Sequence, residues 1–162
     1  MAIYLQYKTP DIKGGVTTEN FVGQILISKF AFGIGRGVSS PIGGTSNREA
    51  STPSVSEIAL SKLLDEATGG LIKEAYNGAG KATAVISFVR TDAGGGKAFL
   101  VYTLSDVMLS GWSTGAEGNG APDERFSLNF TKVETKIIPQ QADGSAGSPF
   151  VVTYDLGQQK LS

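Results

Sequence analysis

Short alternating runs of apolar and polar residues, separated by clusters of glycine, constrain the fold of this chain more than any other feature. The runs are rich in Val, Ile, Phe, Tyr and Thr, and glycine supplies 22 of the 162 residues, well above its usual share of about 7%. Such punctuation is typical of antiparallel β-domains. We therefore predict a mainly β fold, a barrel or sandwich of two antiparallel sheets, in one domain over residues 1–162.

The alternation also predicts where individual strands lie. The first strand is predicted over Ala2–Tyr7, and a second is predicted to begin near Phe21 and to run through the sequence VGQILISKFAFGIG. Within it, Phe30 and Phe32 share one face, so Lys29 and Ala31 are expected on the other. The triple glycine at 94–96 predicts a hairpin connection, and a last strand is predicted in FVVTYDL near the end of the chain.

One segment has helical spacing. Leucine and alanine recur three and four residues apart over positions 63–75. Gly69 and Gly70 are expected to split this segment into a short turn and a helix, with Thr68 as the N-cap and Asn77-Gly78 as the exit.

Two other segments depart from simple alternation. Residues 36–54 are rich in Ser, Gly and Pro and predict a long extended loop, which in a compact domain is usually functional or disordered. In RFSLNFTKVETKII the apolar phase changes after Phe130, which predicts either a bulge or a strand buried on both faces. Burial on both faces would require a partner.

Composition excludes several classes of function. The chain has no cysteine and no histidine, so thiolate chemistry and the common transition-metal sites are excluded, and we expect no cofactor. Its 14 basic and 15 acidic residues give a net charge of −1, with no basic patch for nucleic acid. The N-terminus lacks the pattern of a signal peptide, and no apolar run is long enough to insert into a membrane.

The sequence GWSTG, Gly111 to Gly115, has the Gly-x-Ser-x-Gly spacing of a hydrolase nucleophile elbow. A serine nucleophile needs an activating base, and the chain offers neither a histidine nor a Ser-x-x-Lys pair. Ser113 is therefore expected to close a strand. The acidic pairs Asp65/Glu66 and Asp123/Glu124 are expected to be solvated surface charge.

The C-terminal block from Ser113 to Leu156 resembles the Hcp tube proteins of the bacterial type VI secretion system. The motifs STG, LNFTKVE, PQQADG and YDL occur in the order and spacing typical of that family. In the N-terminal half, DIKGG and LSKLLDEAT also match, and Phe30-Ala31-Phe32-Gly33 occupies a place that often carries tryptophans in the family. The resemblance covers nearly the whole chain.

The resemblance implies a structural protein without enzymatic activity that forms hexameric rings. Rings would stack into a tube fired with spike proteins through a contracting sheath, leave the bacterial cytoplasm without a signal peptide, and carry effectors in the lumen. The chain ends soon after Leu156, so no fused toxin domain is expected. Lys29 and Ala31 are the lumen candidates. The candidates for contacts between subunits or stacked rings lie in the long loop: Arg36, Ser40, Pro41, Ile42, Arg48 and Glu49.

Two alternatives remain open at this point. A monomeric β-sandwich that binds a carbohydrate or peptide would use the same strand pattern, but it would be expected to expose an aromatic cluster, and the chain has only one tryptophan, Trp112. A hydrolase using Ser113 ranks third because it lacks a base.

Overall fold

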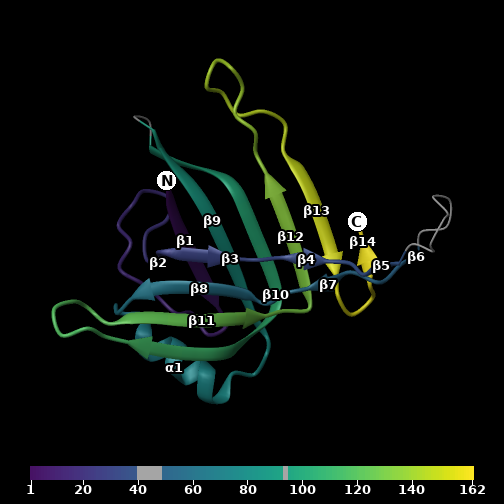
Figure 1. The fold of residues 1–162 in the computed structure, drawn as a ribbon. Helices are drawn as coiled ribbons and strands as arrows, with labels where there is room; N and C mark the ends of the chain where they lie inside the picture. The colour runs from purple at the N-terminus through teal and green to yellow at the C-terminus, as the bar shows by residue number, and fades with distance from the viewer. Residues whose placement is uncertain (40–48, 93–94) are drawn as a thin grey trace.

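The computed structural model describes residues 1–39, 49–92 and 95–162, and it shows a mainly β fold with one helix (Figure 1). The elements in chain order are β1 (Ala2–Lys8), β2 (Ile25–Ile27), β3 (Lys29–Ala31), β4 (Ile34–Gly35), β5 (Val38–Ser39), β6 (Glu49–Ala50), β7 (Ser54–Val55), β8 (Ile58–Leu63), α1 (Thr68–Asn77), β9 (Ala82–Asp92), β10 (Gly95–Gly115), β11 (Asp123–Asn129), β12 (Lys132–Ile137), β13 (Phe150–Asp155) and β14 (Lys160–Leu161). The predicted fold class, antiparallel sheets with a single helix, is confirmed for these residues.

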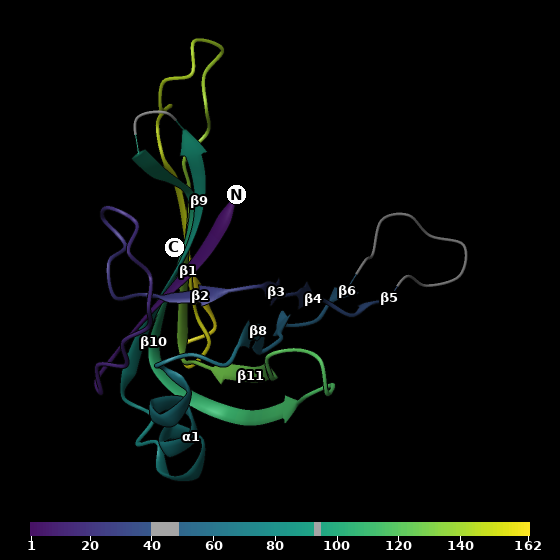
Figure 2. The same cartoon turned by 90° about the vertical axis from the view of Figure 1, so that its left-hand side faces the viewer.

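The long strand β10 joins two antiparallel sheets. Its first part pairs with β9 and β12 in sheet A, which continues through β1 and β2 on one side and through β13 and β14 on the other. Its second part pairs with β11, and β8 and β3 complete sheet B. A bulge between Leu109 and Gly111 lies close to this change of sheet, where β10 curves strongly (Figure 2). The described path ends at the edge strand β14, so a sandwich describes it better than a closed barrel.

The predicted second strand is divided. It begins at Ile25 instead of near Phe21, and Ser28 separates β2, which pairs with β1, from β3, which pairs with β8. The Ser28 backbone N–H and side-chain hydroxyl both donate to the Ser61 carbonyl, at 2.8 and 3.0 Å. One extended segment therefore ties sheet A to sheet B.

The prediction that the apolar phase change after Phe130 marks a bulge or two-sided burial is wrong. The segment forms two strands, β11 in sheet B and β12 in sheet A, and the chain turns between them at Phe130 and Thr131. The apolar positions change phase because the chain passes from sheet B to sheet A at this turn, and the side of the strand that faces the core changes with it. A bulge does occur nearby, but in β10.

The core fills the space between the two sheets. Its fully buried members come from β1, β2, β8, β9, β10 and β11, and they include Leu5, Ile25, Ile58, Ile86, Leu104 and Leu128. A smaller cluster of Tyr4, Phe21 and Val89 lies on the opposite face of sheet A. There the tyrosine and phenylalanine rings pack 5.0 Å apart.

The helix α1 packs against the core through Leu71, which is fully buried. Gly70 lies so close to Ile12 that an added Cβ would come within 2.9 Å of its side chain. The Tyr7 hydroxyl donates to Glu74 at 3.0 Å, and burial raises the pKa of this tyrosine. A small residue, an apolar contact and a hydrogen bond thus fix the helix against β1 and the turn that follows it.

The predicted N-cap is wrong. The N-cap of α1 is Ala67, and Thr68 is the first helical residue. Asp65 makes the local contact instead, because its carboxylate accepts a hydrogen bond from the Ala67 backbone N–H at 2.8 Å. The Thr68 hydroxyl donates to the Glu124 carboxylate instead.

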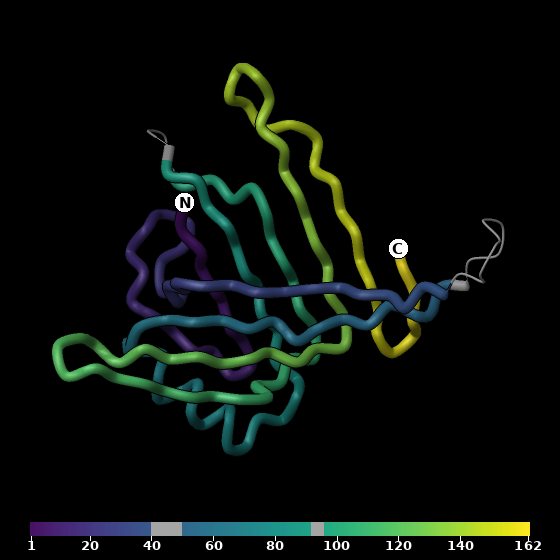
Figure 3. Tube along the Cα trace, in the orientation of Figure 1, coloured from purple at the N-terminus to yellow at the C-terminus, as the bar shows by residue number. Residues whose placement is uncertain are grey.

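The predicted long loop is a two-stranded ribbon over its described part. The strand pairs β4–β7 and β5–β6 extend it away from the two sheets, as the Cα trace shows (Figure 3). The Arg36 Nε donates to the Ser51 carbonyl at 3.1 Å, and the Gly37 N–H donates to the Ser51 hydroxyl at 2.8 Å. The sequence predicted a loop because these residues lack apolar alternation. A ribbon that does not pack against the core needs no such alternation.

Candidate functional site

Sheet B has an apolar inward face and a polar outward face. Phe30, Leu60, Phe126 and Trp112 lie opposite one another on adjacent strands and pack against the core. Successive residues of a strand point to opposite sides, so Lys29 and Ala31 lie on the outward face, where both are exposed. The alternation predicted at Lys29–Phe32 is therefore confirmed, while the location of this face in a lumen stays a prediction.

The strand register builds the outward face as two rows across β3, β8, β11 and β10. The first row is polar and contains Lys29, Ser61, Arg125 and Ser113. The second row contains only small side chains, from Ala31, Ala59, Ser127 and Gly111. Together with the residues between them, Phe30, Leu60, Phe126 and Trp112, the rows line a concavity of about 910 Å³, here called the sheet B trough.

The charges of the trough are unequally satisfied. The Arg125 Nε lies 3.5 Å from the Asp123 carboxylate, and both side chains are largely solvated, so this pair contributes little to stability. Glu57, near the opposite end of the trough, accepts a hydrogen bond from the Ser110 hydroxyl. Lys29 forms no ion pair within the part of the chain that the structure describes.

Ser113 lies inside β10, opposite Arg125, and the strand ends two residues later at Gly115. The expectation that Ser113 belongs to a strand end is confirmed. A nucleophile elbow requires a sharp turn between a strand and a helix, and this geometry is not found at Ser113.

Trp112 packs against the core instead of forming an exposed platform, and its indole N–H is buried without a hydrogen-bond partner among the described residues. Trp112 therefore does not supply the exposed aromatic platform expected of a monomeric ligand-binding sandwich.

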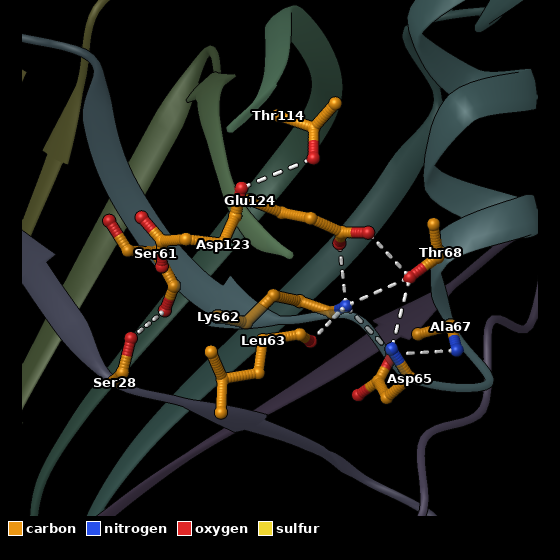
Figure 4. Close-up of polar contacts among 10 residues, drawn as sticks. All are labelled: Ser28, Ser61, Lys62, Leu63, Asp65, Ala67, Thr68, Thr114, Asp123 and Glu124. Atoms are coloured by element: carbon orange, nitrogen blue, oxygen red, sulfur yellow. Dashed lines mark hydrogen bonds and ion pairs between the residues drawn. The ribbon is translucent and has the colours of Figure 1, made fainter. Parts of the chain in front are cut away.

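A buried ion cluster lies beneath the inward face of sheet B, next to the start of α1 (Figure 4). Lys62 and Glu124 face each other across β8 and β11, both are fully buried, and their Nζ and Oε2 atoms are 2.7 Å apart. The Lys62 Nζ also lies 2.7 Å from the Asp65 carboxylate and donates to the Leu63 carbonyl at 2.9 Å. The Thr68 hydroxyl donates to the second Glu124 oxygen at 2.7 Å.

This cluster corrects the prediction that the two acidic pairs are solvated. Glu124 is buried, and Asp65 is mostly covered, because each is paired with Lys62. Adjacent residues of a strand point to opposite sides, which sends Asp123 to the outward face and Glu124 into the interior. The burial of Glu124 depends on Lys62, which lies directly opposite it on β8 and was not included in the prediction.

The inner face of sheet A extends beyond the cover of sheet B. One row across β9, β10, β12 and β13 contains Phe88, Leu100, Ile137 and Phe150. Phe88 is buried, but Ile137 and Phe150 are exposed. An apolar surface of this kind on an isolated subunit indicates contact with another molecule.

The ribbon carries the remaining candidates. Arg36 is exposed and bonded to Ser51, and its neighbours Ile34 and Val38 are exposed apolar residues. The backbone of Glu49 pairs with Ser39 in β5. Ser40, Pro41, Ile42 and Arg48 lie outside the described residues.

Within residues 1–39, 49–92 and 95–162, no group of three or more acidic, histidine or cysteine side chains is arranged to hold a metal ion. In the same ranges, no helix has the length and hydropathy needed to span a membrane.

Comparison with known proteins adds the following. The family described as "Type VI secretion system effector, Hcp" matches residues 4–137. The protein Hcp1 of Pseudomonas aeruginosa is 29% identical over 108 residues, which cover 64% of this chain and 65% of that protein. The matched region thus spans slightly less than two thirds of this relative's length.

Solved structures share the fold. A type six secretion system protein superposes with a TM-score of 0.88 at 24% identity, covering 99% of both chains. Hcp1 from Salmonella typhimurium gives a TM-score of 0.73 at 20% identity, with 99% of this chain and 98% of that chain covered. A type VI secretion system effector from Yersinia pestis gives 0.72 at 15% identity, with 94% and 98% covered.

Proposed function

The chain belongs to the Hcp family of the type VI secretion system, and from this premise we propose that it forms hexameric rings that stack into the inner tube of that system. The family consists of structural, secreted proteins, which agrees with a chain that lacks a catalytic base for Ser113. In this proposal the tube meets spike and sheath proteins, leaves the bacterial cytoplasm, and carries effectors in its lumen.

The observation that carries the proposal is the uncovered apolar end of sheet A. Ile137 and Phe150 face each other on β12 and β13 with no cover from sheet B, and Val151 is exposed on the opposite side of β13. In an isolated chain these groups would remain in water, whereas a neighbouring subunit would bury them.

A second apolar surface lies at the opposite edge of the molecule, near β2 and the end of β8 (Figure 1). Met1, Leu26, Leu63 and Leu64 are exposed there around a depression of about 630 Å³. Two different surfaces on opposite edges suit a head-to-tail contact, and such contacts close into a ring when the rotation between subunits permits it. A two-fold dimer would instead join one surface to itself.

The ribbon supports the stacking of rings. It projects from the two sheets and exposes Ile34 and Val38 together with Arg36, so its described part presents apolar and charged groups to the solvent. We propose that Arg36, Glu49 and the residues between them contact a neighbouring subunit or ring.

Light scattering after size-exclusion chromatography tests the ring. We expect six times the 16.8 kDa chain mass, with ring-shaped particles by negative-stain electron microscopy. Phe150→Asp should shift the protein to smaller species that retain the native far-UV circular dichroism spectrum, because the charge enters the proposed interface. Asn77→Asp places the same charge on the exposed end of α1 and serves as the control. A wild-type protein that is monomeric at tens of micromolar would contradict the proposal.

A further inference from the structure

We infer that the sheet B trough binds acidic segments of the proteins that the tube carries. The inference rests on the proposed function and names the chemistry of the cargo. Its basis is the row of Lys29 and Arg125 across the trough, two cations that the register aligns on strands separated only by β8.

The spacing of these cations suits an extended polypeptide. Neighbouring strands are about 4.8 Å apart, so the backbones that carry Lys29 and Arg125 are separated by about 10 Å. In the extended polyproline II conformation, residues three apart are separated by about 9 Å and lie on the same side of the chain, because it has three residues per turn. A segment that crosses the strands with carboxylates at such positions could therefore place one on each cation.

The small residues of the trough leave room for this approach. The row beside the cations contains only small residues, Ala31, Ala59, Ser127 and Gly111. No large side chain of this row therefore blocks the approach of a ligand to Lys29 and Arg125. The hydroxyls of Ser61 and Ser113 lie in the cation row, and the Ser113 side chain is exposed. A backbone can thus come close to the sheet while its acidic side chains reach the charged ends of Lys29 and Arg125.

The carboxylates of this face lie toward its ends. Asp123 is beside Arg125 at 3.5 Å, and Glu57 is hydrogen-bonded to Ser110. Neither pairs with Lys29. The weak contact between Asp123 and Arg125 can exchange for a carboxylate of the cargo, since the Arg125 side chain is mostly exposed to water.

Six copies of the trough in one ring would strengthen binding. One exposed ion pair contributes little, but a cargo protein that engages several subunits at once gains from the high effective concentration of the remaining sites. Binding of this kind is expected to weaken as salt is raised, because the pairs are exposed.

The test uses the assembled protein and fluorescein-labelled peptides of twelve residues. One peptide repeats Asp-Gly-Gly, a second repeats Asn-Gly-Gly, and a single-stranded oligothymidine of the same length reports on general anion binding. Fluorescence anisotropy is recorded at low and high sodium chloride. We expect the acidic peptide to bind at low salt, the neutral peptide to bind at least tenfold more weakly, and the oligonucleotide to bind no better than the neutral peptide.

Variants then assign binding to the trough. Lys29→Gln and Arg125→Gln should each weaken binding of the acidic peptide about threefold, and the double variant about tenfold. Ala31→Trp should weaken it by filling the trough without changing charge. Lys160→Gln removes an exposed cation of β14 outside the trough and should leave binding unchanged.

Light scattering on every variant separates the two proposals. A hexameric ring that binds acidic and neutral peptides equally, that prefers the oligonucleotide, or that binds equally well after the double substitution would overturn the inference and leave the ring proposal intact. A monomer whose binding still depends on Lys29 and Arg125 would support the trough and contradict the ring alone.

Discussion

The two ends of one apolar row in sheet A have the same chemistry and opposite surroundings. At the β9 end Phe88 is 8% exposed, while at the β13 end Ile137 and Phe150 are 44% and 64% exposed. Sheet B covers the first end and stops short of the second. Hydrophobicity alone therefore does not distinguish the residues that fold the subunit from those that are available for assembly. The distinction depends on whether sheet B covers the residue.

The covered region also contains charge. Lys62 and Glu124 are buried at the edge of the same core as Phe88, and their polar atoms are paired with each other and with Asp65, Thr68 and the Leu63 carbonyl. The buried region thus contains paired charges, whereas the uncovered end of sheet A exposes apolar side chains to the solvent.

The first prediction compares the two phenylalanines of this row. Phe88→Ala should lower the free energy of unfolding by about 3–5 kcal/mol, because it removes a buried ring that packs against Phe30, Phe99 and Tyr102. Phe150→Ala should change the stability of the subunit by less than about 0.5 kcal/mol, since the ring is already mostly in water. Urea denaturation at a protein concentration low enough for the subunit to be monomeric provides both values, because ring dissociation would otherwise add to the measured stability.

The oligomer completes this comparison. Phe150→Ala should weaken the ring, measured as a larger fraction of small species on dilution. Equal losses of stability from both substitutions would show that β13 folds against a core in the isolated subunit, and the distinction between the two ends would be wrong.

The second prediction concerns the buried ion cluster. Glu124→Ala should cost about 3 kcal/mol, because it leaves the buried Lys62 with only one carboxylate partner. Glu66→Ala changes a neighbouring exposed carboxylate and should be nearly neutral. A double variant, Lys62→Met with Glu124→Leu, should recover part of the loss, because both fully buried charges are then removed, while the partly exposed Asp65 loses its cation partner.

Thermal and urea unfolding measure these changes. If Glu124→Ala were as mild as Glu66→Ala, Glu124 would have to be accessible to water, contrary to its burial in the structure.

The third prediction tests the inward face of sheet B. Phe30 stacks on Tyr102 and contacts Phe88 edge to face, but it is only half-buried, so Phe30→Ala should cost about 2 kcal/mol, less than a fully buried phenylalanine. Its neighbour Ala31 is exposed on the other face, and Ala31→Ser should leave stability unchanged. The midpoints of urea unfolding report both, and a larger loss at Ala31 would reverse the assignment of the two faces.

The sequence predicted those parts of the fold that depend on local alternation. The strands β1 and β13, the helix and the two faces at Lys29–Phe32 all follow from residues close together in the chain. The family was also accessible, because its motifs are short and ordered along the sequence.

The remaining features depend on pairing between distant strands. The burial of Glu124 follows from its position opposite Lys62, 62 residues earlier, and no local pattern contains that information. The same holds for the row of Lys29 and Arg125 and for the division of β10 between two sheets. Register decides which charges meet, and it is fixed only when the whole sheet forms.

The smallest effect is expected at Ser113, on the uncovered face of sheet B. Ser113→Ala should change neither the free energy of unfolding beyond about 0.5 kcal/mol nor the oligomeric mass, because the hydroxyl is exposed near the end of a paired strand. It should also leave hydrolysis of p-nitrophenyl acetate at the level of a protein-free blank, since the chain has no histidine to activate the serine. A reproducible rate that this substitution abolishes would overturn the structural interpretation of GWSTG. The substitution therefore tests whether this exposed face of sheet B has a catalytic role in addition to a role in binding.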